Sequence, residues 1–395
     1  MQFSPTPEQQ QLGDMVQRFL GEQYAFETRR KILDSAAGWS REIWSKLADL
    51  GLLALQVPED QGGMAPAVVE TLLTLTAMGK AMLLEPYVSS AILGTALIRD
   101  LGSRQQREEL LPGMASGERI SVLAHLEPGA RYDLRRVATA ARRSGGSWTL
   151  EGRKSVVQHA PAADLLLVSA VTSAGISVFT VPREAKGVSL TPYRIVDGSC
   201  AAEVELTGAP GALLGEEGRA FSAIEGAFDL GIAAVCAEAA GALQATLDTT
   251  VEYTRTRKQF GVPIGSFQAL QHRMADMLIH VEQARSMSYL AAMRAVEPPS
   301  RERRRALAAA KVVVGNACRF VGQQAVQLHG GMGVTDETAV SHLFRRLTAL
   351  ELQLGDTAHH LEQFIAASAP EQDGARRPRA DRAEHTGVLH EAEGT

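Results

Sequence analysis

The stretch YTRTRKQFGVPIGSFQALQHR, from Tyr253 to Arg273, combines several side chains that could do chemistry. Its pattern indicates that one helix ends here and another begins near Ser266, a residue type favoured at helix N-caps. The junction between the two helices is cationic and rich in side-chain amides. Such a junction could hold a cofactor for this chain's own active site, hold part of a cofactor seated in another subunit, or hold nothing.

Histidine and cysteine residues give no indication of a metal site. His272, His280 and His342 lie in helical stretches and have no second ligand at a metal-binding spacing. The cysteines at positions 200, 236 and 318 also lack such a spacing, and we expect them to be small core residues. The basic run RERRRA at 301–306 is typical of a solvated helix start. The sequence therefore predicts no metal centre.

The composition is that of an ordinary globular protein. The chain has 395 residues, with 45% hydrophobic residues, 22% charged residues and a net charge of -5. The negative balance argues against a nucleic-acid binder. We also expect no membrane span and no signal peptide, because no apolar run reaches the necessary length and the N-terminus MQFSPTPEQQ lacks the charged-then-apolar layout. An odd, sparse set of cysteines indicates the reducing cytoplasm.

Three blocks of different periodicity must position these side chains. Residues 1–122 read as helices, with Gly79 at a point where a helix could end or pack closely. Residues 123–220 read as short strands, with a hairpin turn at Gly145 and Gly146, and predict a small antiparallel β domain. Residues 221–368 predict a bundle of four long helices, and the polar stretch 369–395 predicts a disordered tail. The predicted fold class is therefore α+β and multidomain, without a Rossmann-type sheet.

This layout and three segments resemble the acyl-CoA dehydrogenase family. The segments are RTRKQFG at 255–261, FQALQ at 267–271 and QLHGGMGVTDE at 327–337. The resemblance extends over about residues 3–367, and the chain looks most like the small subunits of two-gene enzymes of the pimeloyl-CoA dehydrogenase kind. It implies FAD as cofactor, an acyl-CoA as substrate and electron transfer flavoprotein as electron acceptor. In the family reaction a carboxylate removes the α-proton, and the β-hydrogen leaves as hydride to the flavin.

The resemblance implies that the junction grips the adenine and diphosphate half of an FAD whose flavin ring lies in the adjacent subunit. An Arg fork suits the diphosphate, a Phe can pack on adenine or sugar, and glycines permit close backbone approach. Without a ligand, the Arg would be a helix-end cation and the glycines a helix C-cap. The cofactor residues carried over from the family are Arg257, Gln259, Phe260, Gln268, Gln327, Gly330 and Gly331.

The family segments that surround the flavin ring are altered. LEPGARYD, residues 126–133, has Leu126 in place of the family's hydroxyl residue, and the bulky pair Arg131 and Tyr132 in place of small residues. KSVVQH, residues 154–159, has Val156 for an aromatic, with Gln158 and His159 for a hydroxyl residue and an asparagine. We expect the Arg–Tyr pair to fill space that a ligand would otherwise use, and His159 to be a surface or satisfied polar group.

The catalytic Glu of the family is missing at both of its known places. The resemblance puts Leu354 at one position and Gly231 at the other, and neither has a titratable side chain. Asp356 is the one nearby carboxylate, and we interpret it as a helix N-cap rather than a base. Asp229 matches a family Asp near the CoA, but Ile232 replaces the Arg that usually follows.

Three hypotheses remain. In the first, the chain is a β-type subunit of a heterotetramer and completes the FAD site of a catalytic partner. In the second, it is a self-sufficient homo-oligomeric flavoenzyme that uses Asp356 as base. In the third, it is a flavin-free scaffold. The resemblance suggests dicarboxylic, aromatic-derived or sterol-derived acyl-CoAs, with specificity residing largely in the partner.

Overall fold

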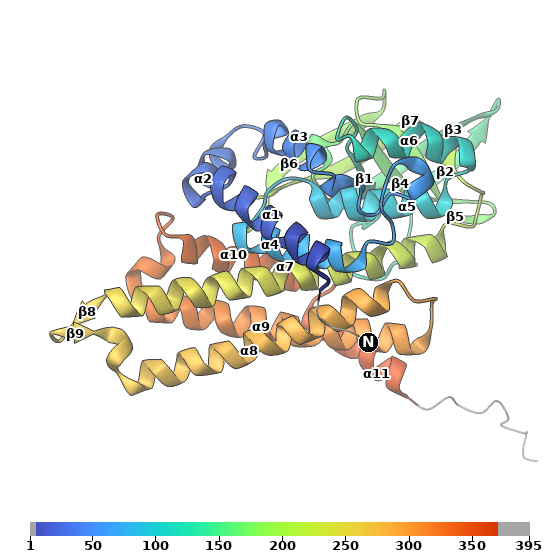
Figure 1. Cartoon of the computed structure of the whole chain (residues 1–395). Coiled ribbons are helices and arrows are strands. Elements are labelled where there is room, and N and C mark those ends of the chain that lie inside the picture. Colours follow the sequence, from blue (N-terminus) through green and yellow to red (C-terminus); the bar gives the residue numbers. More distant parts are fainter. Residues whose placement is uncertain (1–4, 370–395) are drawn as a thin grey trace, which may run out of the picture.

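The computed structural model describes residues 5–369 in three blocks. Figure 1 shows the N-terminal helices and the β domain above the long helix α7, and helices α8 and α9 below it. The N-terminal helices are α1 (Pro7–Gln23), α2 (Phe26–Asp34), α3 (Arg41–Asp49), α4 (Val68–Ala81), a π-helix (Tyr87–Gly94), α5 (Thr95–Leu101) and α6 (Arg104–Ala115).

The middle block is one seven-stranded sheet that closes on itself. Its strands follow the order β1-β4-β2-β3-β7-β5, β4 also pairs with β5, and β6 pairs with β7. Glycines make the expected hairpin turn, because Gly145 and Gly146 take φ values of 57° and 91° that suit a two-residue turn. The strands are β1 (Ser121–Ala124), β2 (Ala140–Ser144), β3 (Ser147–Gln158), β4 (Leu165–Thr172), β5 (Gly175–Pro182), β6 (Val188–Arg194) and β7 (Cys200–Leu214).

The β domain is largely antiparallel, as expected, but two of its strand pairings are parallel. Strand β1 pairs with β4 in parallel along its length, and β2 meets β4 in parallel at Ala140 and Val171. The chain can return in the same direction because the loop after β1 and the β2–β3 hairpin separate β1 from β4. Short alternating strands do not reveal such a crossover, so the sequence favoured the commoner antiparallel arrangement.

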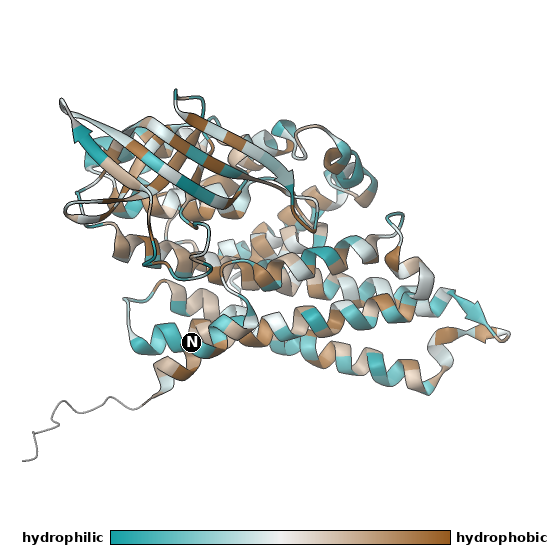
Figure 2. Cartoon of the chain, turned by 180° about the vertical axis from the view of Figure 1, so that it is seen from behind, coloured by the Kyte–Doolittle hydropathy of each residue, from teal (hydrophilic) through white to brown (hydrophobic). Residues whose placement is uncertain are grey.

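The C-terminal block packs five helices. They are α7 (Phe221–Thr256), α8 (Gln268–Ala295), α9 (Arg301–His329), α10 (Ala339–Leu352) and α11 (Thr357–Ser368). Helices α7 to α10 form the expected four-helix bundle, and α11 packs against α9. Teal and brown alternate along these helices in Figure 2, as expected when one stripe of each helix is buried.

Helix α7 is the central buried element of the molecule. It is long and apolar enough by composition to cross a membrane, which we did not expect of any segment, but 83% of its apolar window is buried within the protein. A Cβ on Gly241 would lie 1.9 Å from the Thr76 carbonyl oxygen of α4, and one on Gly79 would lie 1.9 Å from Glu238 O. Helices α4 and α7 therefore cross with their backbones in direct contact.

Two further expectations concern the core and the tail. All three cysteines are buried and free, as predicted. The predicted disordered tail, apart from residue 369, lies outside the described residues.

Candidate functional site

The junction after α7 is a projecting hairpin at the far end of the bundle (Figure 1). The N–H of Arg257 donates to Tyr253 O at 2.8 Å and closes α7, and its own carbonyl accepts the Ile264 N–H at 2.8 Å. Strands β8 (Lys258–Gln259) and β9 (Val262–Pro263) follow. The two turn residues, Phe260 and Gly261, have φ values of 54° and 80°, and the Phe260 side chain is 92% exposed.

The start of α8 differs from the predicted cap. Ser266 is not the N-cap, because its hydroxyl donates to Pro263 O at 2.7 Å inside a short 3-10 turn. Phe267 occupies the cap position and offers no side-chain acceptor. The first backbone N–H groups of α8, beginning at Gln268, therefore have no capping side chain and are open to an anion.

The second predicted cofactor segment lies at the same end of the bundle. Helix α9 ends at His329, whose ring stacks on Tyr253 of α7 with 4.2 Å between ring centroids. The Tyr253 hydroxyl also donates to His329 O at 3.3 Å. Gly330 has φ 59° and ψ −137°, and a Cβ on Gly330 or Gly331 would meet no atom within 4 Å. Gln327 is exposed beside them. The structure thus brings the two predicted stretches together and leaves the glycine backbone open.

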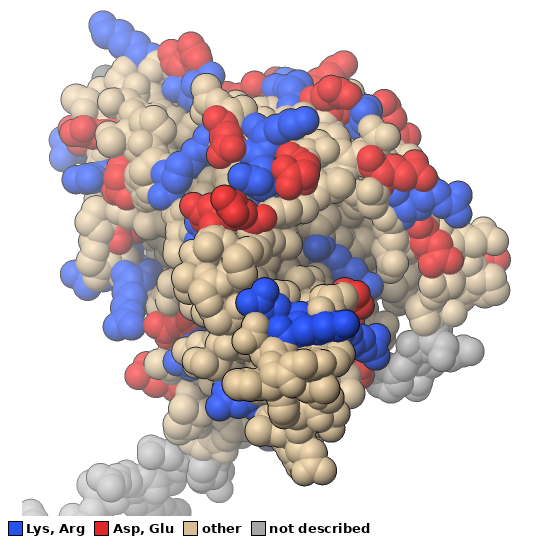
Figure 3. All heavy atoms as spheres, turned by 90° about the vertical axis from the view of Figure 1, so that its left-hand side faces the viewer, with Lys and Arg blue, Asp and Glu red and all other residues tan. Residues whose placement is uncertain are grey.

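Positive charge at this end is available to a ligand. Within residues 5–369, the Arg257 guanidinium forms no ion pair or side-chain hydrogen bond, and Arg257, Lys258 and Gln259 are all exposed. Figure 3 looks onto this end of the molecule, where several Lys and Arg side chains lie close to its protruding part. An unpaired cation, an exposed aromatic ring and an open glycine turn fit a phosphate-bearing aromatic group such as the adenosine diphosphate end of a dinucleotide.

The altered β-domain loop closes onto the connection between α10 and α11. Arg131, with φ 51°, donates from Nη2 to Asp356 Oδ2 at 3.2 Å. The Tyr132 hydroxyl donates to Leu352 O at 3.2 Å, and its ring lies 5.1 Å from that of His359. The bulky pair therefore spans the gap between two domains.

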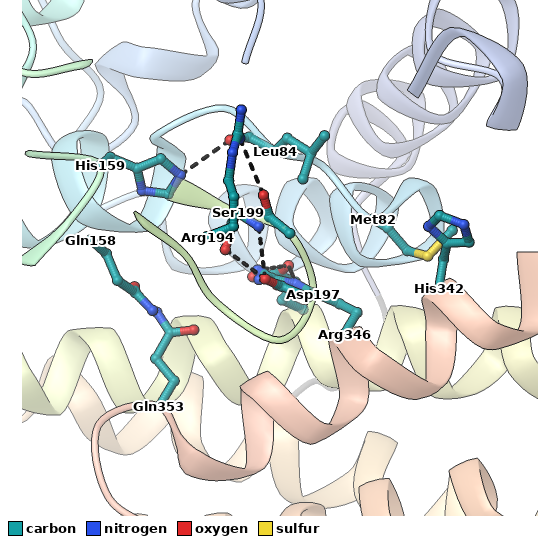
Figure 4. A network of polar contacts seen from close by, with 12 residues as sticks. Met82, Leu84, Gln158, His159, Arg194, Asp197, Ser199, His342, Arg346 and Gln353 are labelled. Carbon is teal, nitrogen blue, oxygen red and sulfur yellow. Dashed lines mark hydrogen bonds and ion pairs between the residues drawn. The ribbon is translucent and has the colours of Figure 1, made fainter. Parts of the chain in front are cut away.

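The second altered segment makes another bridge between the same domains. Gln353 donates from Nε2 to Gln158 Oε1 at 2.8 Å, and Figure 4 shows the two side chains pointing toward each other. His159 has both ring nitrogens bonded, to the Ser89 hydroxyl at 2.9 Å and to Leu84 O at 3.1 Å. Burial lowers the pKa of His159 to about 4. It is a satisfied polar group rather than an available base.

The unaltered residues of these segments have structural partners. Glu127 accepts the N–H groups of Ala138 at 2.6 Å and Thr139 at 3.0 Å. Its Oε1 also pairs with Lys154 Nζ at 2.6 Å in a buried ion pair. Lys154 donates further to the Ser169 hydroxyl at 3.0 Å. Glu127 and Lys154 therefore hold the loop that contains Glu127 to the sheet.

The two positions expected to carry a catalytic Glu face each other across the bundle. A Cβ on Gly231 of α7 would lie 2.6 Å from Leu354 Cδ1 and 2.7 Å from Leu93 Cδ2. Leu354, with φ 58°, packs against the buried cores on both sides of this gap. The glycine and the leucine are complementary in size, and the space is filled with hydrocarbon.

Asp356 is engaged as predicted for an N-cap. Its Oδ1 accepts the His359 N–H at 2.8 Å at the start of α11, and its Oδ2 accepts from Arg131. Although partial burial opposes ionisation, these two donors lower the pKa of Asp356 below its usual range. A carboxylate held in this way is a poor proton acceptor.

Asp229 pairs with an arginine from a different helix, although Ile232 replaces the Arg that usually follows it in the family. It pairs with Arg303 Nη2 at 2.7 Å, and Arg303 also donates to Glu297 O. Burial raises the pKa of Asp229, and the charge of Arg303 opposes that shift. The prediction that 301–306 is a solvated helix start is therefore wrong at Arg303, which is buried. Arg303 is buried because α9 begins beside α7, where its guanidinium pairs with Asp229.

Comparison with known proteins identifies the fold. Sequence models for the N-terminal, middle and C-terminal domains of acyl-CoA dehydrogenases match residues 6–118, 123–207 and 218–369. This chain belongs to the acyl-CoA dehydrogenase family. It is 30% identical to "Probable acyl-CoA dehydrogenase YngJ" of Bacillus subtilis, over 93% of this chain and 99% of that protein. It is also 30% identical to acyl-CoA dehydrogenase FadE27 of Mycobacterium tuberculosis, over 92% and 98%.

Solved structures of acyl-CoA dehydrogenases superpose along nearly the whole chain. The ChsE4–ChsE5 complex of Mycobacterium tuberculosis gives a TM-score of 0.85 at 29% identity, covering 94% of this chain and 100% of that one. Butyryl-CoA dehydrogenase of Megasphaera elsdenii gives 0.85 at 26%, covering 93% and 99%. The family and an FAD-dependent dehydrogenase among the solved structures imply FAD as the cofactor.

One buried feature of this acyl-CoA dehydrogenase was not predicted. Arg346 of α10 donates to Asp197 Oδ2 at 2.5 Å and to Glu238 Oε1 of α7, and Asp197 Oδ1 accepts from the Ser199 hydroxyl at 2.7 Å (Figure 4). The network joins the β domain to two bundle helices. Its members lie 108 and 149 residues apart in the sequence, so no local pattern could have connected them.

Proposed function

We propose that this chain is the β-type subunit of a heteromeric acyl-CoA dehydrogenase and completes the FAD site of a catalytic partner. When bound in the assembled enzyme, FAD would supply the hydride-accepting chemistry. Arg257, Phe260 and Gln268 of this chain bind the adenosine diphosphate end of that FAD, together with the segment from Gln327 to Gly331. The partner supplies the carboxylate base and the acyl pocket.

The observation that carries this proposal is the contrast between two ends of the chain. At the hairpin end, the Arg257 guanidinium has no partner among residues 5–369 and the Gly330 backbone is open. Around the altered segments, the contacts Arg131–Asp356, Tyr132–Leu352 and Gln158–Gln353 join the β domain to the end of α10 and the connection that follows it. The residues predicted to act on a neighbouring subunit are thus available, while those predicted to act within the chain are occupied.

The absence of a base is part of the proposal. Leu354 fills the space above Gly231, and the candidate base Asp356 already accepts from Arg131 and the His359 N–H. Proton abstraction needs a group that is both titratable and within hydrogen-bond reach of the substrate. We infer that these residues provide none, so turnover requires a second chain.

Relatives named as heteromeric complexes support the assembly. One is the ChsE4–ChsE5 complex, and another is a variant of the Tcur3481–Tcur3483 steroid ACAD, with a TM-score of 0.83 at 27% identity over 91% of this chain and 97% of that one. We propose a heterotetramer with electron transfer flavoprotein as electron acceptor. A steroid-derived acyl-CoA is the substrate class we favour over the dicarboxylic class suggested by pimeloyl-type subunits.

The Arg257→Ala variant tests the cofactor role. In the complex with the catalytic partner, we expect the affinity for FAD to fall by at least about tenfold, because a charge-assisted pair with the diphosphate is lost. The flavin-to-protein absorbance ratio after extensive dialysis measures the loss. The matched control is Arg305→Ala, an exposed arginine at the start of α9. An Arg257→Ala complex that retains FAD as well as the control contradicts the proposal.

A further inference from the structure

Arg29 of α2 is a buried cation without an ion pair. It is 0% exposed, and no carboxylate within residues 5–369 pairs with it. Its Nε donates to Met82 O at 2.8 Å, its Nη1 lies 3.0 Å from Nδ1 of His342, and its Nη2 is buried without a partner. Burying a guanidinium is costly unless its donors are satisfied, so each group that accepts from Arg29 is under strong constraint.

This contact fixes the protonation state of His342. An arginine can only donate, so Nδ1 of His342 must accept and its proton must lie on Nε2. Nε2 lies 3.0 Å from Asp336 O, in position to donate to it. The imidazole ring is held edge-on against Phe26 of α2, with 5.1 Å between ring centroids. His342 therefore relays a hydrogen bond from the buried Arg29 to a single backbone carbonyl.

That carbonyl belongs to the segment that follows the predicted cofactor glycines. The 3-10 turn Gly330–Val334 ends two residues before Asp336. The turn is exposed at its outer side chains, with Val334 72% exposed, but Gly333 is packed against Val326 O. Asp336 is one of the points at which the segment is tied back to the protein, through His342 and through an ion pair with Arg345 Nη2 at 2.6 Å; another is Thr338, whose hydroxyl donates to Met332 O at 2.8 Å.

We propose that His342 is a positioning residue for the cofactor-binding segment: through its bond to Asp336 O, it transmits the fixed position of Arg29 in α2 to the turn at Gly330–Val334. Figure 4 shows His342 on α10 beside Met82, whose carbonyl is the other acceptor of Arg29. This inference rests on the proposed function, because it assumes that the turn touches FAD. It adds His342 to the proposed FAD site as a residue that positions the turn without contacting cofactor or substrate.

The relay should depend on pH. The charged groups that face His342 are the guanidiniums of Arg29 and Arg345 and the carboxylate of Asp336. Burial lowers the pKa of His342 and the two guanidiniums add to that effect, while the bond to Asp336 O opposes it. Since the folded pKa lies below the value of about 6.5 for an unfolded histidine, the relay is intact above that pH. Its stability declines as the pH falls below 6.5, because the opened segment then takes up a proton that folded His342, which must accept from Arg29, takes up only at a lower pH.

The test uses the full chain with three variants. His342→Leu can neither accept nor donate, His342→Gln can do both without titrating, and His280→Gln is the control, since His280 packs on Phe320 in the bundle away from this relay. Hydrogen exchange of the amides of residues 333–338 is measured at pH 7.5 and 5.5, corrected for intrinsic rates. We expect about tenfold faster exchange in His342→Leu at pH 7.5 and in the wild type at pH 5.5. His342→Gln should exchange at the same corrected rate at both values.

FAD retention by the complex with the catalytic partner completes the test. We expect His342→Leu to lose FAD more readily at pH 7.5, and His342→Gln to retain it with a flatter pH profile than the wild type. Should the Leu variant not fold, the pH profile of the Gln variant alone decides. Unchanged exchange, or faster exchange with unchanged FAD retention, overturns the inference. If Arg257→Ala still releases FAD in that case, only this inference fails; if it does not, the proposed function fails as well.

Discussion

At the scale of single residues, unusual backbone conformations coincide with the altered positions. Non-glycine residues with positive φ include Arg131, Val156, His159, Phe260 and Leu354. For a β-branched residue such as Val156, with φ 50°, this conformation is strained. Strain of this kind persists where surrounding contacts fix the backbone. With Met82, six such residues lie within residues 5–369, and four of the six, Arg131, Val156, His159 and Leu354, lie in segments that resemble flavin-site or base segments.

Asp356 is the residue that separates the two enzymatic hypotheses. We expect Asp356→Asn to leave turnover of the complex within about twofold of the wild type, because Asn is an equally good N-cap and the proposal gives this side chain no chemical step. Initial rates with a saturating acyl-CoA, together with flavin content, measure the effect. Loss of turnover with flavin retained would instead favour a self-sufficient enzyme with Asp356 as base.

The residues proposed to bind the cofactor were chosen from the sequence, but their surroundings could not be predicted from it. The sequence placed Arg257 and Gly330 on separate helix ends, and only the structure shows the Tyr253–His329 stack that joins those ends. The sequence also indicated no role for His342, because its partners Arg29 and Asp336 come from distant and unrelated segments. Long-range pairs leave no periodic or local signal.

At the scale of elements, glycines without side chains let two helices pack in direct backbone contact. Helices α4 and α7 approach through Gly79 and Gly241, and each glycine lies against the backbone of the other helix. The sequence predicted that Gly79 ends a helix or packs closely, but it could not show against what. The Leu354–Gly231 pair repeats this complementarity at the two positions where the resemblance places a catalytic Glu. Element types were predictable from periodicity, whereas strand direction in β1 and the start of α8 depended on tertiary contacts.

A single methyl group at the helix crossing should be costly. We expect Gly241→Ala to lower the free energy of unfolding by about 2 kcal/mol or more, because its Cβ would meet the Thr76 carbonyl and rigid backbone must move. Gly226→Ala on the same helix is the matched control, since nothing lies within 4 Å of its Cβ. That variant should gain about 0.5–1 kcal/mol from helix propensity. Urea unfolding measures both, and equal values for the two variants would refute direct backbone contact.

At the scale of the whole molecule, buried neutral histidines join the domains. His125 packs edge-on against Phe228, which links the β domain to α7, and His159 bonds to Ser89 and Leu84 of the N-terminal block. Burial lowers the pKa of His125 and of His159 to about 4. Together with the Arg346 network, these contacts hold the three blocks in one arrangement.

Stability should therefore decline on acidification. The unfolded chain protonates these histidines near pH 6.5, whereas the folded chain does so near 4. The stabilisation is complete above pH 6.5 and is lost as the pH falls toward 4, at about 1 kcal/mol per pH unit for each histidine. Urea midpoints at pH 7.5 and 5.5 measure this slope. His159→Asn, which cannot titrate, should reduce it, and a midpoint independent of pH in the wild type would contradict the account.

The most direct test is the flavin content and turnover of the chain purified alone and with its partner. The partner is a dehydrogenase chain that retains the catalytic Glu. Alone, the chain should carry well under one FAD per subunit and show no acyl-CoA oxidation; co-purified with that partner, it should gain both. A yellow, stoichiometrically flavinylated and fully active protein obtained from this chain alone would contradict the proposal that it serves another subunit.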